Sequence, residues 1–137
     1  MNREQVAAWV AAYERAWRAP GTAALAGLFT PKAVYRQGPY VEPVTGLPAI
    51  AGMWEAERDG PGEVFRMTSE VVAVEGATAV VGVEVFYGDP VHQEYRDLWI
   101  MRCAEDGRCV SFEEWPFWPM QPHTAVGGED DSERSNP

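Results

Sequence analysis

The sequence predicts an α+β fold: a cone-shaped, strongly bent antiparallel (mixed) β-sheet wrapped on three N-terminal helices. Three segments with apolar residues at helical spacing lie within the first 57 residues. Four long β-branched and aromatic segments, separated by turn signals, follow them. The length of 137 residues, with 46% hydrophobic side chains, suits one domain with one core.

The first helix is expected to start after Asn2, because this side chain can cap the helix and Gln5 completes a weak capping box. The Pro20-Gly21 pair ends it. Its apolar face consists of Val6, Trp9, Val10, Tyr13, Ala16 and Trp17.

Two shorter helices are expected next. Thr22 can cap the second one, which stops near Pro31. Pro48 suits the first turn of the third one, which continues to Glu57 and is broken by residues 59–62. The apolar residues of the second helix are Leu25, Leu28 and Phe29.

Five strands are expected, and Gly, Asp or Pro marks the turns between the last four. Glu75-Gly76 and Gly88-Asp89-Pro90 make two of these connections, and Glu105-Asp106-Gly107 is a hairpin signal. The strands cover residues 33–37, 64–74, 79–87, 93–103 and 109–117.

The charge balance argues against anionic partners. The chain has 11 basic and 21 acidic residues and a net charge of −10, so nucleic acid and anionic membranes would repel it. No signal peptide and no bilayer-spanning apolar segment is found, so we expect a cytoplasmic protein. Residues 1–121 form the expected domain, and residues 122–137 an acidic, disordered tail.

Six sequence segments, together with this order of helices and strands, resemble the nuclear transport factor 2-like superfamily. Within it, they are similar to the branch of SnoaL-like polyketide cyclases and ketosteroid isomerases. The resemblance implies a pocket for a small apolar ligand at the mouth of the cone and no cofactor. The fold hosts enzymes and non-catalytic binders alike, so it does not by itself fix an activity. The segments are Tyr13-Glu-Arg-Ala-Trp17, residues 23–29, Ala33-Val-Tyr-Arg-Gln37, residues 46–50, Tyr95-Arg-Asp-Leu-Trp99 and residues 107–112.

The resemblance to ketosteroid isomerases implies roles for particular residues. That family places a Tyr of the first helix and a protonated Asp of a late strand around an oxyanion, and these positions fall on Tyr13 and Asp97. The family's general base falls on Gln37. A Gln side chain cannot take up a proton, so ketosteroid isomerisation by that mechanism is not implied.

Strand parity sorts the residues of the fourth expected strand, residues 93–103, into two faces. Gln93, Tyr95, Asp97, Trp99 and Met101 share a face that suits a pocket wall. The alternate residues, among them Leu98 and Ile100, suit a dimer surface. In an apolar pocket the pKa of Asp97 would rise. The alternative for Asp97 is an ion pair with Arg66 or Arg96.

Other side chains are candidates for the proton-transfer and binding groups. Glu114 or Glu84 could replace the missing base, although either could instead be solvated or ion-paired. Paired acids could also activate water, as the resemblance to the limonene epoxide hydrolases of this fold implies. Tyr13 is a pocket donor or a core residue. The expected ligand-binding residues are Trp17, Tyr35, Gln37, Trp54, Tyr95, Trp99 and Phe112.

Three functions remain open from the sequence. The protein is a cofactor-independent isomerase or cyclase that moves a proton on an apolar carbonyl compound, a non-catalytic binder of the same fold, or a homodimeric scaffold. In the scaffold, Trp17, Trp54 and Trp99 would plug the cone. No metal site is expected, because neither His92 nor His123 has a partner at ligand spacing. The aromatic run of residues 115–119 would close the pocket mouth or join a homodimer through the outer sheet face.

Overall fold

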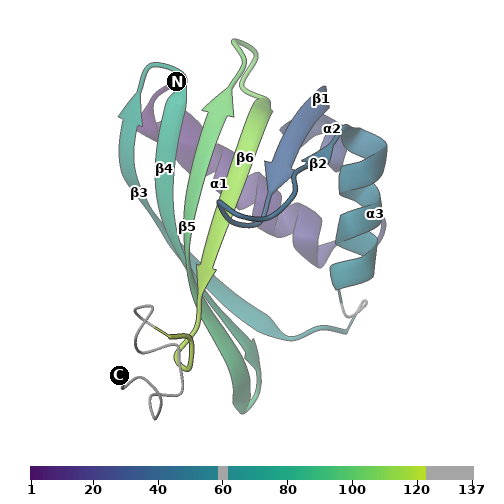
Figure 1. Ribbon diagram of the computed structural model, residues 1–137, viewed down its shortest axis with the longest axis vertical. Helices are drawn as coiled ribbons and strands as arrows, with labels where there is room; N and C mark the ends of the chain where they lie inside the picture. Colours follow the sequence, from purple (N-terminus) through teal and green to yellow (C-terminus); the bar gives the residue numbers. More distant parts are fainter. Residues whose placement is uncertain (59–61, 123–137) are drawn as a thin grey trace, which may run out of the picture.

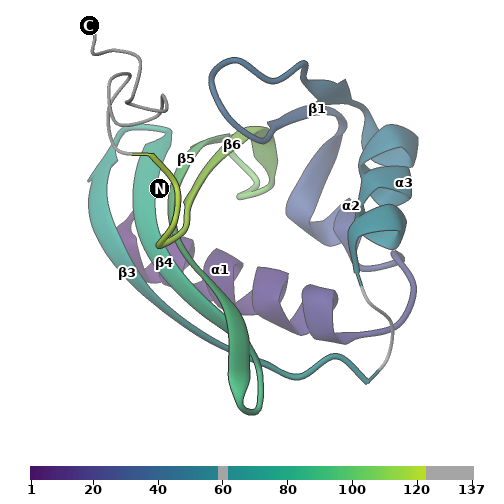
Figure 2. The same ribbon diagram turned by 60° about the horizontal axis from the view of Figure 1, so that its bottom comes forward.

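A six-stranded mixed sheet with strand order β2-β1-β6-β5-β4-β3 curves around the helices (Figures 1 and 2). The structure, a computed structural model, describes residues 1–58 and 62–122 and confirms the α+β class. The expected tail of residues 122–137 lies outside the described part of the chain, except for its first residue. The helices are α1 (Arg3–Arg18), α2 (Leu25–Leu28) and α3 (Leu47–Glu57), and the strands are β1 (Phe29–Arg36), β2 (Val44–Thr45), β3 (Phe65–Glu75), β4 (Thr78–Gly88), β5 (Val91–Cys103) and β6 (Cys109–Phe117).

The signals for the starts of α1 and α3 are confirmed. Asn2 Oδ1 accepts a hydrogen bond from the backbone N–H of Gln5 at 2.8 Å, and Gln5 Oε1 accepts one from the backbone N–H of Asn2 at 2.9 Å. This is a complete capping box. Pro48 lies in the first turn of α3, where its missing N–H leaves no helical hydrogen bond unmade.

The expected second helix is shorter than the sequence pattern indicated. Helix α2 is a single turn, and Ala24, not Thr22, is its N-cap residue and makes no side-chain cap hydrogen bond. Phe29 and Pro31 already belong to strand β1. Pro31 pushes the residue before it toward extended backbone, so the chain leaves the helix earlier than its apolar spacing suggests.

The sheet is mixed because β1 runs parallel to β6, whereas every other neighbouring pair is antiparallel. The two-residue strand β2 was not expected from the sequence. Strand β6 continues through Pro116 to Phe117, the residue at which the sequence predicted its end. Its pairing with β1 ends at Glu113, so Pro116 has a neighbour on β5 only and needs no hydrogen bond on its other side.

An aromatic core joins α1 to the inner face of the sheet. The ring of Trp9 packs against Phe112, with 5.6 Å between centroids, and Tyr13 packs against Trp99 at 4.6 Å. The indole N–H of Trp9 donates to the carbonyl of Leu28 at 3.0 Å, which ties α1 to α2. In the described residues, no helix has the length and apolar character needed to span a bilayer.

Candidate active site

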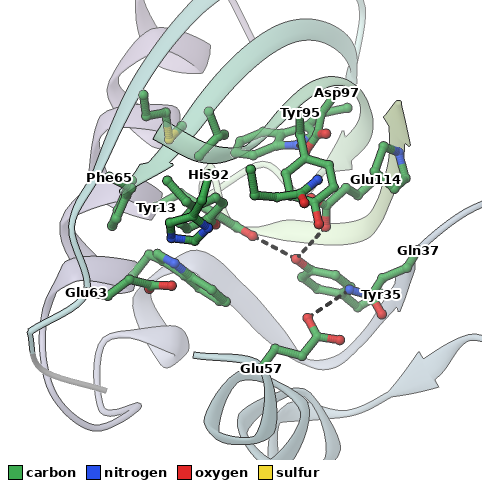
Figure 3. Close-up of a pocket in the computed structure, with 17 residues that line it drawn as sticks. Tyr13, Tyr35, Gln37, Glu57, Glu63, Phe65, His92, Tyr95, Asp97 and Glu114 are labelled. Atoms are coloured by element: carbon green, nitrogen blue, oxygen red, sulfur yellow. Dashed lines mark hydrogen bonds between the residues drawn. The ribbon is translucent and has the colours of Figure 1, made fainter. Parts of the chain in front are cut away.

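A cavity of about 460 Å³ lies where the C-terminal half of α1 and the end of α3 face the inner side of the sheet (Figure 3). Its wall combines aromatic rings with carboxyl and amide groups, a mixture that suits a small, partly apolar ligand. The lining residues are Tyr13, Trp17, Tyr35, Gln37, Glu57, Glu63, Phe65, Met67, Val85, Tyr87, His92, Gln93, Tyr95, Asp97, Trp99, Glu114 and Pro116.

The face predicted for the fourth expected strand, residues 93–103, is confirmed in the structure. Gln93, Tyr95, Asp97 and Trp99 of β5 all line the cavity, and Met101 continues the same face into the core. The sequence argument therefore placed β5 correctly, because the period of two survives the curvature of the sheet.

Asp97 and Glu114 form a carboxyl pair in the cavity wall. In the β5–β6 ladder Asp97 lies opposite Pro116 and Glu114 lies opposite Trp99, so the two acids are diagonal neighbours on one face. Asp97 is only 8% exposed. Its Oδ2 accepts a hydrogen bond from the indole N–H of Trp99 at 3.4 Å, whereas its buried Oδ1 receives none from the described residues. A proton on one carboxyl allows the two acids to hydrogen-bond with each other.

Burial raises the pKa of both carboxyls. The pKa of Glu114 lies well above its usual range because of desolvation, and the neighbouring Asp97 raises it further. The pKa of Asp97 is also raised by desolvation, but hydrogen bonds from Glu114 and Trp99 favour its charged form. Two carboxyls this close do not ionise independently. Burial therefore favours protonation of the pair, and the stronger upward shift makes Glu114 the more readily protonated member.

A chain of hydroxyl groups leads to this pair from α1 and β1 (Figure 3). Tyr35 Oη donates to Glu114 Oε1 at 3.3 Å, and the hydroxyl oxygens of Tyr13 and Tyr35 are 2.7 Å apart. A phenol has one proton, so Tyr13 must donate to Tyr35 when Tyr35 donates to Glu114. Burial raises the pKa of both phenols well above 10, and they remain protonated donors. The donors thus run from Tyr13 through Tyr35 and Glu114 to Asp97.

Tyr13 and Asp97 therefore share the cavity, but not as two free donors facing one position. The hydroxyl of Tyr13 is committed to Tyr35 in this structure. The alternative ion pair for Asp97 is wrong for both of its expected partners. Arg96 Nε lies 3.7 Å from Glu84 Oε2 and so pairs with that carboxylate instead. The guanidinium carbon of Arg66 lies 4.9 Å from the ring centroid of Phe86.

Three of the expected site residues do not line the cavity. Glu84 lies on the opposite face of β4 from Val83 and Val85, where it is partly exposed and near Arg96, so the expectation that it could be the base is corrected. Trp54 and Phe112 are 1% exposed and belong to the core behind the wall. They support Tyr13, whose ring lies 5.1 Å from Trp54 and 5.7 Å from Phe112.

The remaining expected residues, Trp17, Tyr35, Gln37, Tyr95 and Trp99, all line the cavity. The cavity is open although Trp17 and Trp99 form part of its wall, so the alternative in which tryptophans plug the cone is wrong. The amide of Gln37 donates to Glu57 Oε1 at 3.0 Å and so joins the segment after β1 to the end of α3 (Figure 3). From the aromatic run of residues 115–119, Pro116 reaches the cavity, and the ring of Trp118 packs 6.3 Å from Tyr95.

Several lining residues were not expected from the sequence. Glu57 ends α3 and Glu63 lies in the connection to β3, so only the tertiary fold brings them to the sheet. His92 precedes the expected strand of residues 93–103, yet it belongs to β5 and lines the cavity. Gly88 makes room for it, because a Cβ at this position would overlap the imidazole ring. The other unexpected lining residues are Phe65, Met67, Val85 and Tyr87.

No group of three or more His, Cys, Asp or Glu side chains within residues 1–58 and 62–122 is arranged to hold a metal ion.

Comparison with protein families gives one match over most of the chain. The family described as the SnoaL-like domain matches residues 9–112. Comparison with curated proteins finds no match.

Solved structures show the same fold at low sequence identity. A protein from Kribbella flavida, provisionally described as a ketosteroid isomerase, is 20% identical, with a TM-score of 0.61 over 90% of this chain and 85% of its own. A protein from Sinorhizobium meliloti, provisionally described as a polyketide cyclase, is 24% identical, with a TM-score of 0.60. The match covers 77% of this chain and 92% of that protein. A protein of unknown function from Mesorhizobium loti is 24% identical, with a TM-score of 0.62. The match covers 85% of this chain and 95% of that protein.

Proposed function

Because this chain belongs to the SnoaL-like domain family, we propose that it is a small-molecule pocket enzyme, a cofactor-independent isomerase or cyclase that transfers a proton on a largely apolar carbonyl compound. The observation that carries the proposal is the Asp97–Glu114 pair, which places two carboxyls with raised pKa values side by side in the wall of a cavity. In the proposal, Asp97 is the anionic member and Glu114 the protonated one. Carboxyl groups whose environments separate their protonation states divide naturally into a base and an acid.

Asp97 is the proposed general base. It is buried, its Oδ1 receives no hydrogen bond from the described residues, and a carboxylate with a raised pKa is a stronger base than a free one. In the proposed step, Asp97 takes a proton from the carbon next to the substrate carbonyl. The electron pair of the broken C–H bond moves into the carbonyl group and forms an enolate. Return of the proton to a different carbon completes an isomerisation without any net oxidation or reduction.

Glu114 is the proposed donor to the enolate oxygen. Before the reaction its proton is shared with Asp97. Once Asp97 has accepted the substrate proton, this hydrogen bond is no longer held by a negative charge, and the Glu114 proton can turn to the new oxyanion. Tyr35, which donates to Glu114 and is bonded to Tyr13, is the proposed positioning residue for this carboxyl.

Deuterium exchange tests the proposal directly. Cyclic ketones and β,γ-unsaturated enones are incubated with the protein in deuterated buffer, and loss of the α-proton signal is followed by proton NMR. The wild type is expected to exchange at least one member of the panel. Asp97→Asn should slow exchange by about 10²–10⁴-fold, the usual contribution of a general base.

The matched control is Glu84→Gln, which removes the same charge from the outer face of the sheet. It should exchange like the wild type. Saturable ligand binding without exchange in the wild type would remove the catalytic proposal and favour a non-catalytic binding protein, a role that Gln37 at the family's base position also favours.

We also propose that the protein acts in the cytoplasm as a homodimer formed through the outer sheet face. Leu98 and Ile100 point to that face, opposite Trp115 and Glu113 in the ladder, and Phe117 beside them is 49% exposed. Sedimentation velocity of the wild type and of Ile100→Glu tests this. A dimer that becomes a monomer in the variant is expected, and a monomeric wild type would refute it.

A further inference from the structure

The two cysteines of the chain lie directly opposite each other in the β5–β6 ladder. Cys103 ends β5 and Cys109 begins β6, on either side of the short hairpin loop (Figure 1). The sequence contains no other cysteine, and both are free thiols in this structure. Neither of them lines the cavity, so the proposed proton-transfer chemistry makes no use of them.

The backbone places the two side chains as close together as an antiparallel ladder allows. The N–H of Cys103 donates to the carbonyl of Ala77 at 2.9 Å, in the turn before β4, and so points away from β6. The next residue, Ala104, donates to the carbonyl of Arg108 at 2.8 Å. Cys103 and Cys109 therefore form a non-hydrogen-bonded pair, in which the Cα atoms are about 4.5 Å apart. This separation lies within the range of about 4.4–6.8 Å that a disulfide spans.

The two sulfur atoms also interact in the reduced protein. A hydrogen bond from Cys109 lowers the pKa of the Cys103 thiol against the effect of burial, whereas the same contact, together with burial, raises the pKa of Cys109. Cys109 Sγ lies 3.1 Å from the carbonyl oxygen of Ser111, which can also accept its proton. Cys109 is thus held as a thiol, and Cys103 is the member that ionises first and is the better nucleophile.

Exposure separates the two thiols in the same order. Cys103 is 7% exposed beside the hairpin loop, in which Glu105 and Asp106 are exposed. Cys109 is fully buried, and Phe29 of β1 is its neighbour on the other side of β6. A reagent from the solvent therefore reaches Cys103 first, and Cys109 reacts with the sulfur of Cys103.

We propose that Cys103 and Cys109 are a redox-active pair that forms a reversible intrachain disulfide by exchange with a low-molecular-weight disulfide such as oxidised glutathione. The Cys103 thiolate attacks one sulfur of the reagent, the S–S bond of the reagent breaks, and one thiolate leaves. Cys109 then loses its proton to water, its sulfur attacks the Cys103 sulfur, and the second thiolate leaves. Two electrons pass from the protein to the reagent, which takes up two protons and becomes two free thiols. The disulfide joins β5 to β6 at the hairpin, and it does not depend on the proposed function.

Thiol labelling across a redox series tests the proposal. The full chain is equilibrated in buffers with increasing ratios of oxidised to reduced glutathione and is then unfolded in excess N-ethylmaleimide. Intact-mass spectrometry counts the labels and the glutathione adducts. The wild type is expected to pass from two labels to none, without an adduct. The ratio at the midpoint should be about tenfold or more lower in buffer than in urea, because the native ladder holds the two sulfurs together.

Serine variants assign the two roles. Cys109→Ser leaves the attacking thiol without a second sulfur, so it should accumulate a glutathione adduct on Cys103. Cys103→Ser leaves only the buried thiol, which should form an adduct several-fold more slowly. Circular dichroism identifies a variant that has not folded, and the wild-type series decides the proposal without either variant. Two labels on the wild type throughout, disulfides only between chains, or a midpoint ratio no lower in buffer than in urea would each overturn the proposal.

Discussion

Asp97 and Glu114 are diagonal neighbours across the β5–β6 ladder, with both carboxyls on the inner face of the sheet. No lysine or arginine lies beside them in the cavity wall, in the part of the chain that the structure describes. Protonation of one carboxyl, instead of a cationic side chain, would consequently relieve the repulsion within the pair. The stability and the activity of the protein should both depend on that proton.

Glu114→Gln should change how stability depends on pH. The pKa of Glu114 is raised by burial in the folded state, whereas in the unfolded chain the group ionises near its ordinary value of 4.5. Between these two pKa values the folded state binds more protons than the unfolded state, so the free energy of unfolding falls as pH rises. Each pKa unit of difference between the folded and unfolded states lowers the free energy of unfolding by about 1.4 kcal/mol. Gln mimics the protonated acid at all pH values. The free energy of unfolding of the variant, measured by urea denaturation between pH 4.5 and 8, should therefore no longer show this decline.

Glu84→Gln is the control for this experiment, because Glu84 lies outside the cavity. It should follow the wild-type curve. A wild-type stability that rises across this pH range would show that Glu114 is not held in its protonated form.

Tyr35→Phe should raise the pKa of Glu114 further. The Tyr35 hydroxyl donates to Glu114 Oε1, and this hydrogen bond favours the charged carboxylate and opposes the effect of burial. Without it, any activity that needs protonated Glu114 should persist to higher pH. The variant should also lose about 1–3 kcal/mol of stability, because the buried hydroxyl of Tyr13 loses its partner.

Tyr13→Phe separates the two effects of Tyr35. It removes the far end of the hydroxyl chain but keeps the bond from Tyr35 to Glu114. The pH profile of exchange should therefore keep its alkaline limb where the wild type has it. Identical shifts in the two variants would mean that the chain does not act through Glu114.

The inward face of the strands could be predicted from the sequence, and the depth of a side chain could not. Alternation placed Asp97 in the cavity wall, whereas Glu114 was only one of two candidates for the base. The same argument could not distinguish the wall from the core behind it. Phe112 and Trp54 therefore turned out to be supports for Tyr13 instead of lining residues.

The acids from outside the sheet show a second limit of the sequence. Glu57 and Glu63 belong to a helix end and a connection, which have no periodicity that points into a cavity. Their position depends on how α3 docks, a property of tertiary packing. For Glu84, the sequence did not show which face of β4 the helices would cover.

Substitution of Trp54 and of Trp17 should separate support from lining. Trp54 is fully buried, and its ring lies 5.1 Å from Tyr13 and 4.8 Å from Trp17. Trp54→Ala should cost about 3–5 kcal/mol in chemical denaturation, as other large core truncations do. Trp17→Ala should cost less, because Trp17 is only partly buried and borders the cavity, but it should weaken ligand binding more per unit of stability lost. Equal stability losses would place Trp17 in the core as well.

Gly88→Ala should move His92 out of the cavity wall. Gly88 has a φ of +94°, which disfavours any side chain, and a Cβ there would overlap the His92 imidazole and lie 2.9 Å from the carbonyl oxygen of Pro90. We expect a loss of about 1–3 kcal/mol in urea denaturation and a changed chemical environment for the imidazole in NMR spectra. Gly52→Ala is the matched control, since Gly52 lies within α3 with open space around its Cβ position, and it should stabilise the protein by about 0.5–1 kcal/mol. An unchanged His92 signal in Gly88→Ala would contradict the packing of this imidazole against Gly88, because the ring and the new methyl group cannot share the same space.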